Sequence, residues 1–91
     1  MKLDELRQNI DIIDKKIADL FNERMRLCLD IAREKARIDA PVADNGREKQ
    51  VIENVTACVD GDKAEYLKDV YEAIFTVSKK YQMSVAKEEL E

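Results

Sequence analysis

Cationic and neutral polar side chains occupy positions of this sequence where the surrounding pattern calls for apolar ones. Arg24 interrupts a helical series of Leu and Ile. Lys35 lies about three turns later on the same helix, on a neighbouring line of side chains that runs through Cys28 and Ile31. Ser78 and Gln82 lie four residues apart within a second apolar series, which places them on one helix face. Guanidinium and ammonium groups bind carboxylates, and Arg does so through two parallel hydrogen bonds. Because buried cations need a counter-charge, this combination suggests a polar cavity for a small dianion.

Each of these residues, taken singly, also has a simpler interpretation. An Arg in an apolar stripe can set the register of a helical dimer or pair with a carboxylate. A Ser on a packed helix face usually bonds to its own backbone four residues back. Lys35 and Arg47 are of types that most often lie in solvent. Only the set as a whole favours an anion site.

The element that must position these side chains is a long amphipathic helix. Its apolar residues recur at steps of three and four, or at their sum of seven, with Arg24 taking the place between Leu20 and Leu27. Without interruption by Pro or Gly, the series comprises Leu3, Leu6, Ile10, Ile13, Ile17, Leu20, Leu27, Ile31 and Ile38. A helix of this length spans on the order of 50 Å, because each residue adds 1.5 Å. One small domain cannot cover such a stripe, so the sequence predicts a partner for it.

Arg7 adds a geometrical condition. It precedes Arg24 by 17 positions, which corresponds to roughly 25 Å along a helix. The two side chains of one chain cannot grip the same small molecule. If Arg7 belongs to the anion site, it comes from a second copy of the chain.

The remaining pattern predicts an all-α protein with one long, one short and one medium helix. We expect helix 1 at about 3–39, a loop at 40–44, helix 2 at about 45–60 and helix 3 at about 63–87. Pro41 ends the first helix, Asp44 is the expected N-cap of the second, and Gly61 is its expected C-terminal residue. The chain of 91 residues is expected to form a single domain, 1–91.

Composition excludes several classes of function. The net charge of −4 argues against nucleic-acid binding. No apolar run suits a membrane span or a signal peptide, so we expect no membrane partner and a cytoplasmic location. The chain has no His, which removes His-based nucleophilic sites and the usual zinc sites, and no metal is expected. Cys28 and Cys58 fall at apolar helix positions, and core packing is expected for both.

At this level of detail the chain resembles the all-helical class of chorismate mutase. The likeness begins in residues 3–7 and 10–14 and continues through 20–24 and 31–35. Its sharpest part is Pro41-Val42-Ala43-Asp44-Asn45-Gly46-Arg47-Glu48, which is similar to the family's P-V-x-D-x-x-R-E loop. It ends in Ser78-Lys79-Lys80-Tyr81-Gln82, similar to the family's S-x-x-x-Q. The match covers nearly the whole chain.

The resemblance implies an intertwined helical homodimer that rearranges chorismate to prephenate, a pericyclic reaction without a cofactor. It implies that Arg24 and the partner's Arg7 bind the two substrate carboxylates, supported by Arg47 and Ser78. Lys35 and Gln82 would donate hydrogen bonds to the ether oxygen of the breaking bond, and Glu48 with the Asp44 backbone would hold the ring hydroxyl. The residues implied in catalysis are therefore Lys35, Gln82, Glu48 and Arg24; those implied in substrate binding are Arg7, Arg24, Lys35, Asp44, Arg47, Glu48, Ser78 and Gln82.

Two alternatives of other classes remain open. A lyase on the same scaffold, which splits isochorismate into salicylate and pyruvate, would also use Arg, Lys and Gln. The start of helix 2 and Ser78 resemble the mutase more. A plain dimerisation or effector-binding module is disfavoured because such a module needs few polar residues in its stripe.

Overall fold

Three α-helices and one short 3-10 helix form the part of the chain that the structure describes, residues 2–41 and 44–90. In this computed structural model, α1 spans Leu3–Arg37, α2 spans Asn45–Thr56, η1 spans Gly61–Lys63 and α3 spans Ala64–Leu90. The described residues include no strand, and the predicted all-α class is confirmed. That residues 1–91 form one domain stays a prediction.

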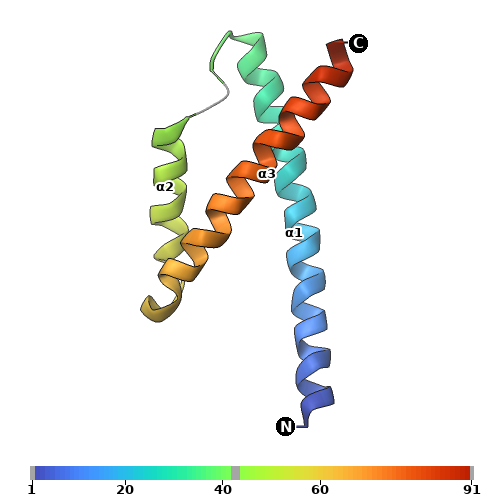
Figure 1. Cartoon of the computed structure of the whole chain (residues 1–91), viewed down its shortest axis with the longest axis vertical. Coiled ribbons are helices and arrows are strands. Elements are labelled where there is room, and N and C mark those ends of the chain that lie inside the picture. Colours follow the sequence, from blue (N-terminus) through green and yellow to red (C-terminus); the bar gives the residue numbers. More distant parts are fainter. Residues whose placement is uncertain (1, 42–43, 91) are drawn as a thin grey trace.

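The helices are arranged as an open frame rather than a bundle. α3 crosses the upper half of α1, α2 lies beside the first half of α3, and the N-terminal half of α1 projects alone (Figure 1). The extents are 53 × 29 × 15 Å and the radius of gyration is 16.4 Å. A compact domain of this length has a radius of gyration of about 12 Å. A single chain therefore leaves much of its helix surface uncovered.

The apolar stripe of α1 is the main uncovered surface. In the N-terminal half of the helix its side chains are roughly half exposed, from 46% at Leu6 to 63% at Leu20. Phe75 is the buried apolar side chain of the described residues and lies on α3. The packed region is thus confined to the neighbourhood of the helix crossing, and the predicted stripe faces solvent in the single chain.

α1 ends in a Schellman-type cap built on an aspartate. The N–H of Ala40 donates to the carbonyl oxygen of Lys35 at 2.8 Å, and the N–H of Asp39 donates to that of Ala36 at 3.3 Å. Asp39 has a φ of 56°, in the left-handed region where a side chain is strained. A glycine normally fills this position, and the negative charge of Asp opposes the helix dipole there.

We therefore expect Asp39→Gly to stabilise the protein. Relief of left-handed strain and of the unfavourable charge outweighs the extra freedom of Gly in the unfolded chain, for a net gain of about 1 kcal/mol in the free energy of unfolding. Urea unfolding at fixed protein concentration measures this gain. Asp39→Ala removes the charge but keeps the Cβ, so it should be less stable than the glycine variant; equal stabilities would show that strain is not the cause.

The start of α2 is as predicted, but its end is not. Asp44 is the N-cap, because its Oδ1 accepts a hydrogen bond from the N–H of Arg47 at 2.9 Å. The prediction of a helix to about residue 60 was wrong, since α2 ends at Thr56. The Cys58 N–H bonds the carbonyl of Val55, three residues back, which tightens the last turn. The backbone is extended at Asp60, so the chain has left the helix before Gly61.

Gly61 opens η1 instead of closing α2. Asp60 precedes this short helix, and the N–H of Lys63 donates to its carbonyl oxygen at 2.9 Å. The Lys63 ammonium also forms an ion pair with the Asp60 carboxylate at 3.2 Å. These local contacts turn the chain directly into α3, which continues to Leu90 rather than to about residue 87. Val42 and Ala43 of the predicted 40–44 loop lie outside the described residues.

The two cysteines have different surroundings. Cys28 is half-buried on α1, whereas Cys58 is exposed and its thiol donates to the Asn54 carbonyl oxygen at 3.3 Å. The prediction that Cys58 packs in the core was therefore wrong, because the residue follows the end of α2 and leaves its packed face. Neither cysteine forms a disulfide.

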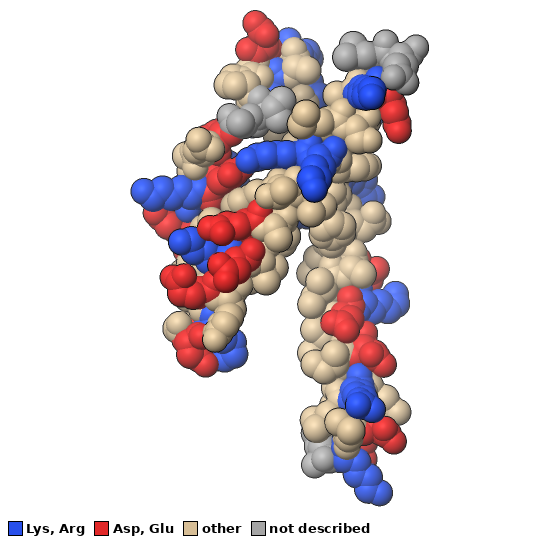
Figure 2. Space-filling model, in the orientation of Figure 1, with Lys and Arg blue, Asp and Glu red and all other residues tan. Residues whose placement is uncertain are grey.

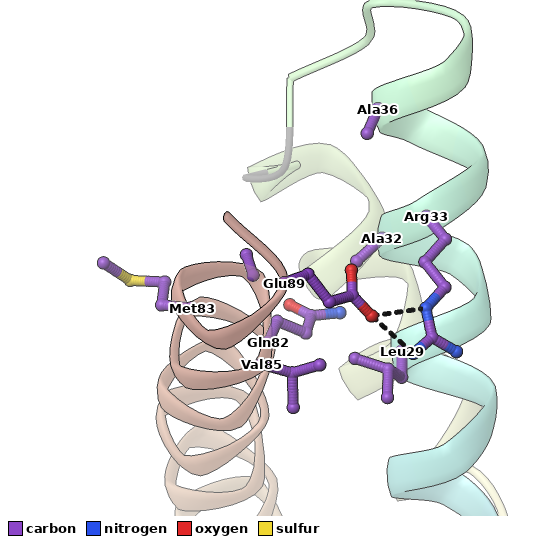
Figure 3. Close-up of a pocket in the computed structure, with 9 residues that line it drawn as sticks. Leu29, Ala32, Arg33, Ala36, Gln82, Met83, Val85 and Glu89 are labelled. Carbon is purple, nitrogen blue, oxygen red and sulfur yellow. Dashed lines mark hydrogen bonds and ion pairs between the residues drawn. The ribbon is translucent and has the colours of Figure 1, made fainter. Parts of the chain in front are cut away.

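An ion pair joins the C-terminal parts of α1 and α3 at the rim of an apolar groove. The guanidinium of Arg33 donates to Oε1 of Glu89 at 2.7 Å, beside Leu29 and Val85 (Figure 3). The hydrogen bond with Glu89 raises the pKa of Arg33. Because the pair is exposed to solvent, it orients the two helix ends more than it stabilises them.

None of the described helices combines the length and apolar character that a bilayer crossing requires.

Candidate functional site

A cavity of about 170 Å³ lies between α1, α2 and α3 and gathers the polar residues that the sequence singles out. Basic side chains cluster at the hollow between α2 and the helix crossing (Figure 2). All the predicted site residues except Arg7 line this cavity: Arg24, Lys35, Asp44, Arg47, Glu48, Ser78 and Gln82. The fold thus joins residues from three helices that are separated by up to 58 positions in the sequence.

Arg24 is held by aromatic faces rather than by a carboxylate. Its guanidinium carbon lies 5.7 Å from the ring centroid of Tyr71 and 5.8 Å from that of Phe75. Its Nη1 donates to Ser78 Oγ at 3.4 Å and to Cys28 Sγ at 3.5 Å. In the part of the chain that the structure describes, no carboxylate forms an ion pair with it. Cation–π contacts position the guanidinium without neutralising its charge, so this charge can bind an anion in the cavity.

Ser78 is fixed by its own helix, as the simpler interpretation expected, and still contacts Arg24. The side chain is buried, with 5% of its surface exposed. Its hydroxyl donates to the Ile74 carbonyl oxygen at 2.7 Å, which fixes the single hydroxyl hydrogen. The lone pairs of the oxygen then accept from the Arg24 guanidinium. Ser78 therefore orients Arg24 from the floor of the cavity.

Gln82 bridges α3 and α1. Its Nε2 donates to the backbone carbonyl oxygen of Cys28 at 2.7 Å. A carboxamide carries two N–H donors, so this bond fixes the orientation of the group and leaves a second donor for a ligand. Lys35 lies on α1 at the same cavity and is half-buried. An ammonium and an amide donor thus line one cavity from two different helices.

The start of α2 supplies the opposite wall. The Asp44 carboxylate is used in the helix cap, and the Arg47 guanidinium donates to Gln50 Oε1 at 2.7 Å. Oε2 of Glu48 lies 2.8 Å from Nζ of Lys79 on α3. This ion pair ties α2 to α3 at the edge of the cavity.

The cavity carries an excess of positive charge. Four cations and two carboxylates line it, the cations being Arg24, Lys35, Arg47 and Lys79. A dicarboxylate would neutralise this excess of two charges, whereas a neutral or cationic ligand would not. Within residues 2–41 and 44–90, no group of three or more Asp, Glu or Cys side chains is placed to hold a metal ion.

Arg7 is the predicted residue that the fold does not bring to the cavity. It is exposed on the projecting N-terminal half of α1 (Figure 1). α1 runs without a break from Leu3 to Arg37, so Arg7 and Arg24 remain roughly 25 Å apart along one chain. A contribution of Arg7 to this chain's own cavity is excluded by that distance.

Sequence reasoning missed two residues that contact the predicted site residues. Tyr71 stacks on Arg24, and a signal was present, because Tyr71, Phe75, Ser78 and Gln82 follow steps of four, three and four on one face of α3. Lys79 carries a weaker signal. It adjoins Ser78, but its partner Glu48 lies 31 residues earlier on another helix, and helical spacing says nothing of such pairs.

Comparisons with known proteins agree with this geometry. The model of the family described as chorismate mutase type II matches residues 6–83. A chorismate mutase of Methanocaldococcus jannaschii is 41% identical over 54 residues, which cover 59% of this chain and 54% of that protein. A bifunctional chorismate mutase/prephenate dehydratase of Buchnera aphidicola subsp. Baizongia pistaciae is 34% identical over 71 residues, 78% of this chain and 19% of that protein.

The aligned part of the chain thus spans about half the length of the first relative and a smaller share of the second. No solved structure matches the chain significantly.

Proposed function

We propose that this chain, which belongs to the chorismate mutase type II family, rearranges chorismate to prephenate. The observation that carries the proposal is the cavity itself, which unites Arg24, Lys35 and Gln82 with an excess of positive charge. Chorismate is a dicarboxylate, so its charge matches that excess. The rearrangement is unimolecular and needs neither a nucleophile nor a proton donor, which suits a chain without His.

Arg24 is proposed to bind one substrate carboxylate. Tyr71 and Phe75 hold its guanidinium from the ring faces, and the Ser78 hydroxyl accepts a hydrogen bond from it. Clamping both carboxylates holds a flexible substrate in the compact conformer from which the two reacting carbons can bond. Arg47 supports this clamp from the first turn of α2.

Lys35 and Gln82 are proposed to stabilise the transition state. The breaking carbon–oxygen bond leaves negative charge on the ether oxygen, and donors fixed in advance at that atom lower the barrier. The bond from Gln82 to the Cys28 carbonyl supports this role, since it orients one N–H and leaves the other for the ether oxygen. Glu48, with the Asp44 backbone, is proposed to accept a hydrogen bond from the ring hydroxyl.

The second carboxylate is proposed to meet Arg7 of the partner in a homodimer. Two observations support this assembly: the exposed apolar stripe of α1 lacks cover in one chain, and Arg7 lies too far from the chain's own cavity. Packing the stripes of two chains together buries both. In the proposed dimer, the N-terminal half of the partner's α1 lies across the cavity.

The test is to incubate the purified protein with chorismate, follow the loss of its diene absorbance and identify the product. Prephenate supports the proposal. Isochorismate serves as the matched control substrate, and release of salicylate and pyruvate from it would favour the lyase instead. If neither substrate reacts with the folded dimer, the dimerisation or effector-binding alternative stands.

We expect the rate to vary by less than about twofold between about pH 6 and 8, because the donor amide of Gln82 does not titrate. An Arg side chain also keeps its charge throughout this range. Initial rates at saturating chorismate in buffers of constant ionic strength measure the profile. A steep loss of rate from about pH 6 to 8 would contradict the role given to Gln82, because it would require a donor that loses its proton there.

A further inference from the structure

We propose that Lys79 is a positioning residue for substrate binding, which acts by holding the Glu48 carboxylate at the edge of the cavity. The inference rests on the proposed function, because Glu48 matters only if the cavity binds a substrate with a ring hydroxyl. The carrying observation is the ion pair between Nζ of Lys79 and Oε2 of Glu48 at 2.8 Å, both of which line the cavity.

The pair is better shielded than six other ion pairs of the described residues. The Glu48 side chain is 27% exposed and that of Lys79 is 41% exposed, whereas both members of these six exposed pairs are at least half exposed. It also joins two helices, since Glu48 lies on α2 and Lys79 on α3. A partly shielded pair between separate elements fixes side-chain orientation more firmly than an exposed pair within one helix.

Orientation matters because Glu48 has two oxygens with different uses. Lys79 holds Oε2, and a carboxylate retains further acceptor sites for a substrate hydroxyl. Without the ammonium, the Glu48 side chain is free to leave the geometry in which it accepts that hydrogen bond. Lys79 therefore positions Glu48, and Glu48 in turn accepts the hydrogen bond from the ring hydroxyl.

The positive charge of Lys79 gives a second reason to expect that this residue supports substrate binding. An unpaired carboxylate in the wall repels a dianionic substrate, and the ammonium of Lys79 offsets this repulsion at short range. The hydroxyl contact and the charge balance exist both in the bound substrate and in the transition state. Their loss should therefore raise KM and leave kcat nearly unchanged. A residue at the reacting atoms would instead lower kcat.

The experiment compares wild type with Lys79→Met, Lys79→Arg and the control Lys80→Met. Lys80 is the next residue on α3 and is exposed outside the cavity. For Lys79→Met we expect KM for chorismate to rise about tenfold, with kcat within about threefold of wild type. Lys79→Arg keeps the ion pair and should restore KM to within about twofold, and Lys80→Met should leave both constants unchanged.

A double-mutant cycle with Glu48→Gln tests whether Lys79 acts through Glu48. In the Glu48→Gln background we expect Lys79→Met to change KM by less than about twofold, because its partner charge is gone. A full tenfold effect in that background would overturn the inference and show that Lys79 meets the substrate itself. An unchanged KM in Lys79→Met, with a lower urea midpoint, would also overturn it and leave a purely structural pair. If the wild-type protein does not turn over chorismate, the proposed function is refuted before any variant is compared.

Discussion

Arg24→Ala is expected to lower kcat/KM for chorismate by about 10³-fold or more. The Arg24 guanidinium is held in position by two aromatic ring faces and by the Ser78 hydroxyl. Removing it leaves a substrate carboxylate unpaired in a partly desolvated cavity, a loss of about 4 kcal/mol, or 10³-fold in rate. Steady-state kinetics on the purified variant measure the effect.

Two further variants make this result specific. Arg24→Lys keeps the charge but loses the planar fork, so it should recover only part of the rate. Arg26→Ala is the matched control, because Arg26 is exposed on the other side of α1 and does not line the cavity. It should stay within about twofold of wild type. Equal losses in the Arg24 and Arg26 variants would point to a general effect of arginine removal and contradict the clamp.

Arg24→Leu separates an enzyme from a plain dimerisation module. Leu completes the apolar stripe and leaves Ser78 bonded to the Ile74 carbonyl, so no buried hydroxyl loses its acceptor. The free energy of unfolding without substrate is therefore expected to rise, while turnover is abolished. In a module whose Arg only sets the register, the same substitution would raise stability without functional loss. Urea unfolding and chorismate turnover of the same preparation give both readings.

Arg7→Ala is expected to lower kcat/KM by about 10²–10³-fold, although Arg7 lies roughly 25 Å from Arg24 on the same helix. The physical reason is that the partner's Arg7 binds the second carboxylate in the proposed dimer. Lys15→Ala is the control, since Lys15 is exposed on the same half of α1 and forms an ion pair with Asp19, four residues on. It should keep its activity within about twofold.

The position of Arg7 makes the result decisive for the assembly. A substitution so far from the cavity leaves every contact inside the chain's own site intact. A large loss of activity with an unchanged dimer in sedimentation would therefore assign Arg7 to the other chain's site. Wild-type kinetics of Arg7→Ala would contradict the shared site and leave the second carboxylate to groups within one chain.

The sequence predicts the elements of this fold where helical spacing determines them. The stripe of α1 fixes a helix from Leu3, and the Asp44 cap fixes the start of α2. The end of α2 was missed because Cys58 and Val59 continue the apolar spacing beyond the helix. The C-cap at Ala57 and the extended backbone at Asp60 mark that boundary, and apolar periodicity gives no signal of either.

The same limit applies to the site. The types and helix faces of Arg24, Ser78 and Gln82 are visible in the sequence, and the structure places them at one cavity. The pairing of Lys79 with Glu48 was not predictable, since it depends on how α2 lies against α3. The proposed role of Arg7 requires a second chain. Helix geometry gives the distance of Arg7 from the chain's own cavity, but the sequence does not show how a second chain would lie against it.

Mixing two inactive variants tests the central claim, a chorismate mutase site shared between chains, most directly. Arg7→Ala and Arg24→Ala are unfolded together, refolded at equal concentration and assayed for prephenate. Random pairing makes about half of the dimers mixed, and each mixed dimer has one intact site, so about a quarter of wild-type activity should return. Each variant refolded alone should stay inactive. If the refolded mixture contains mixed dimers and still forms no prephenate, the shared site is contradicted.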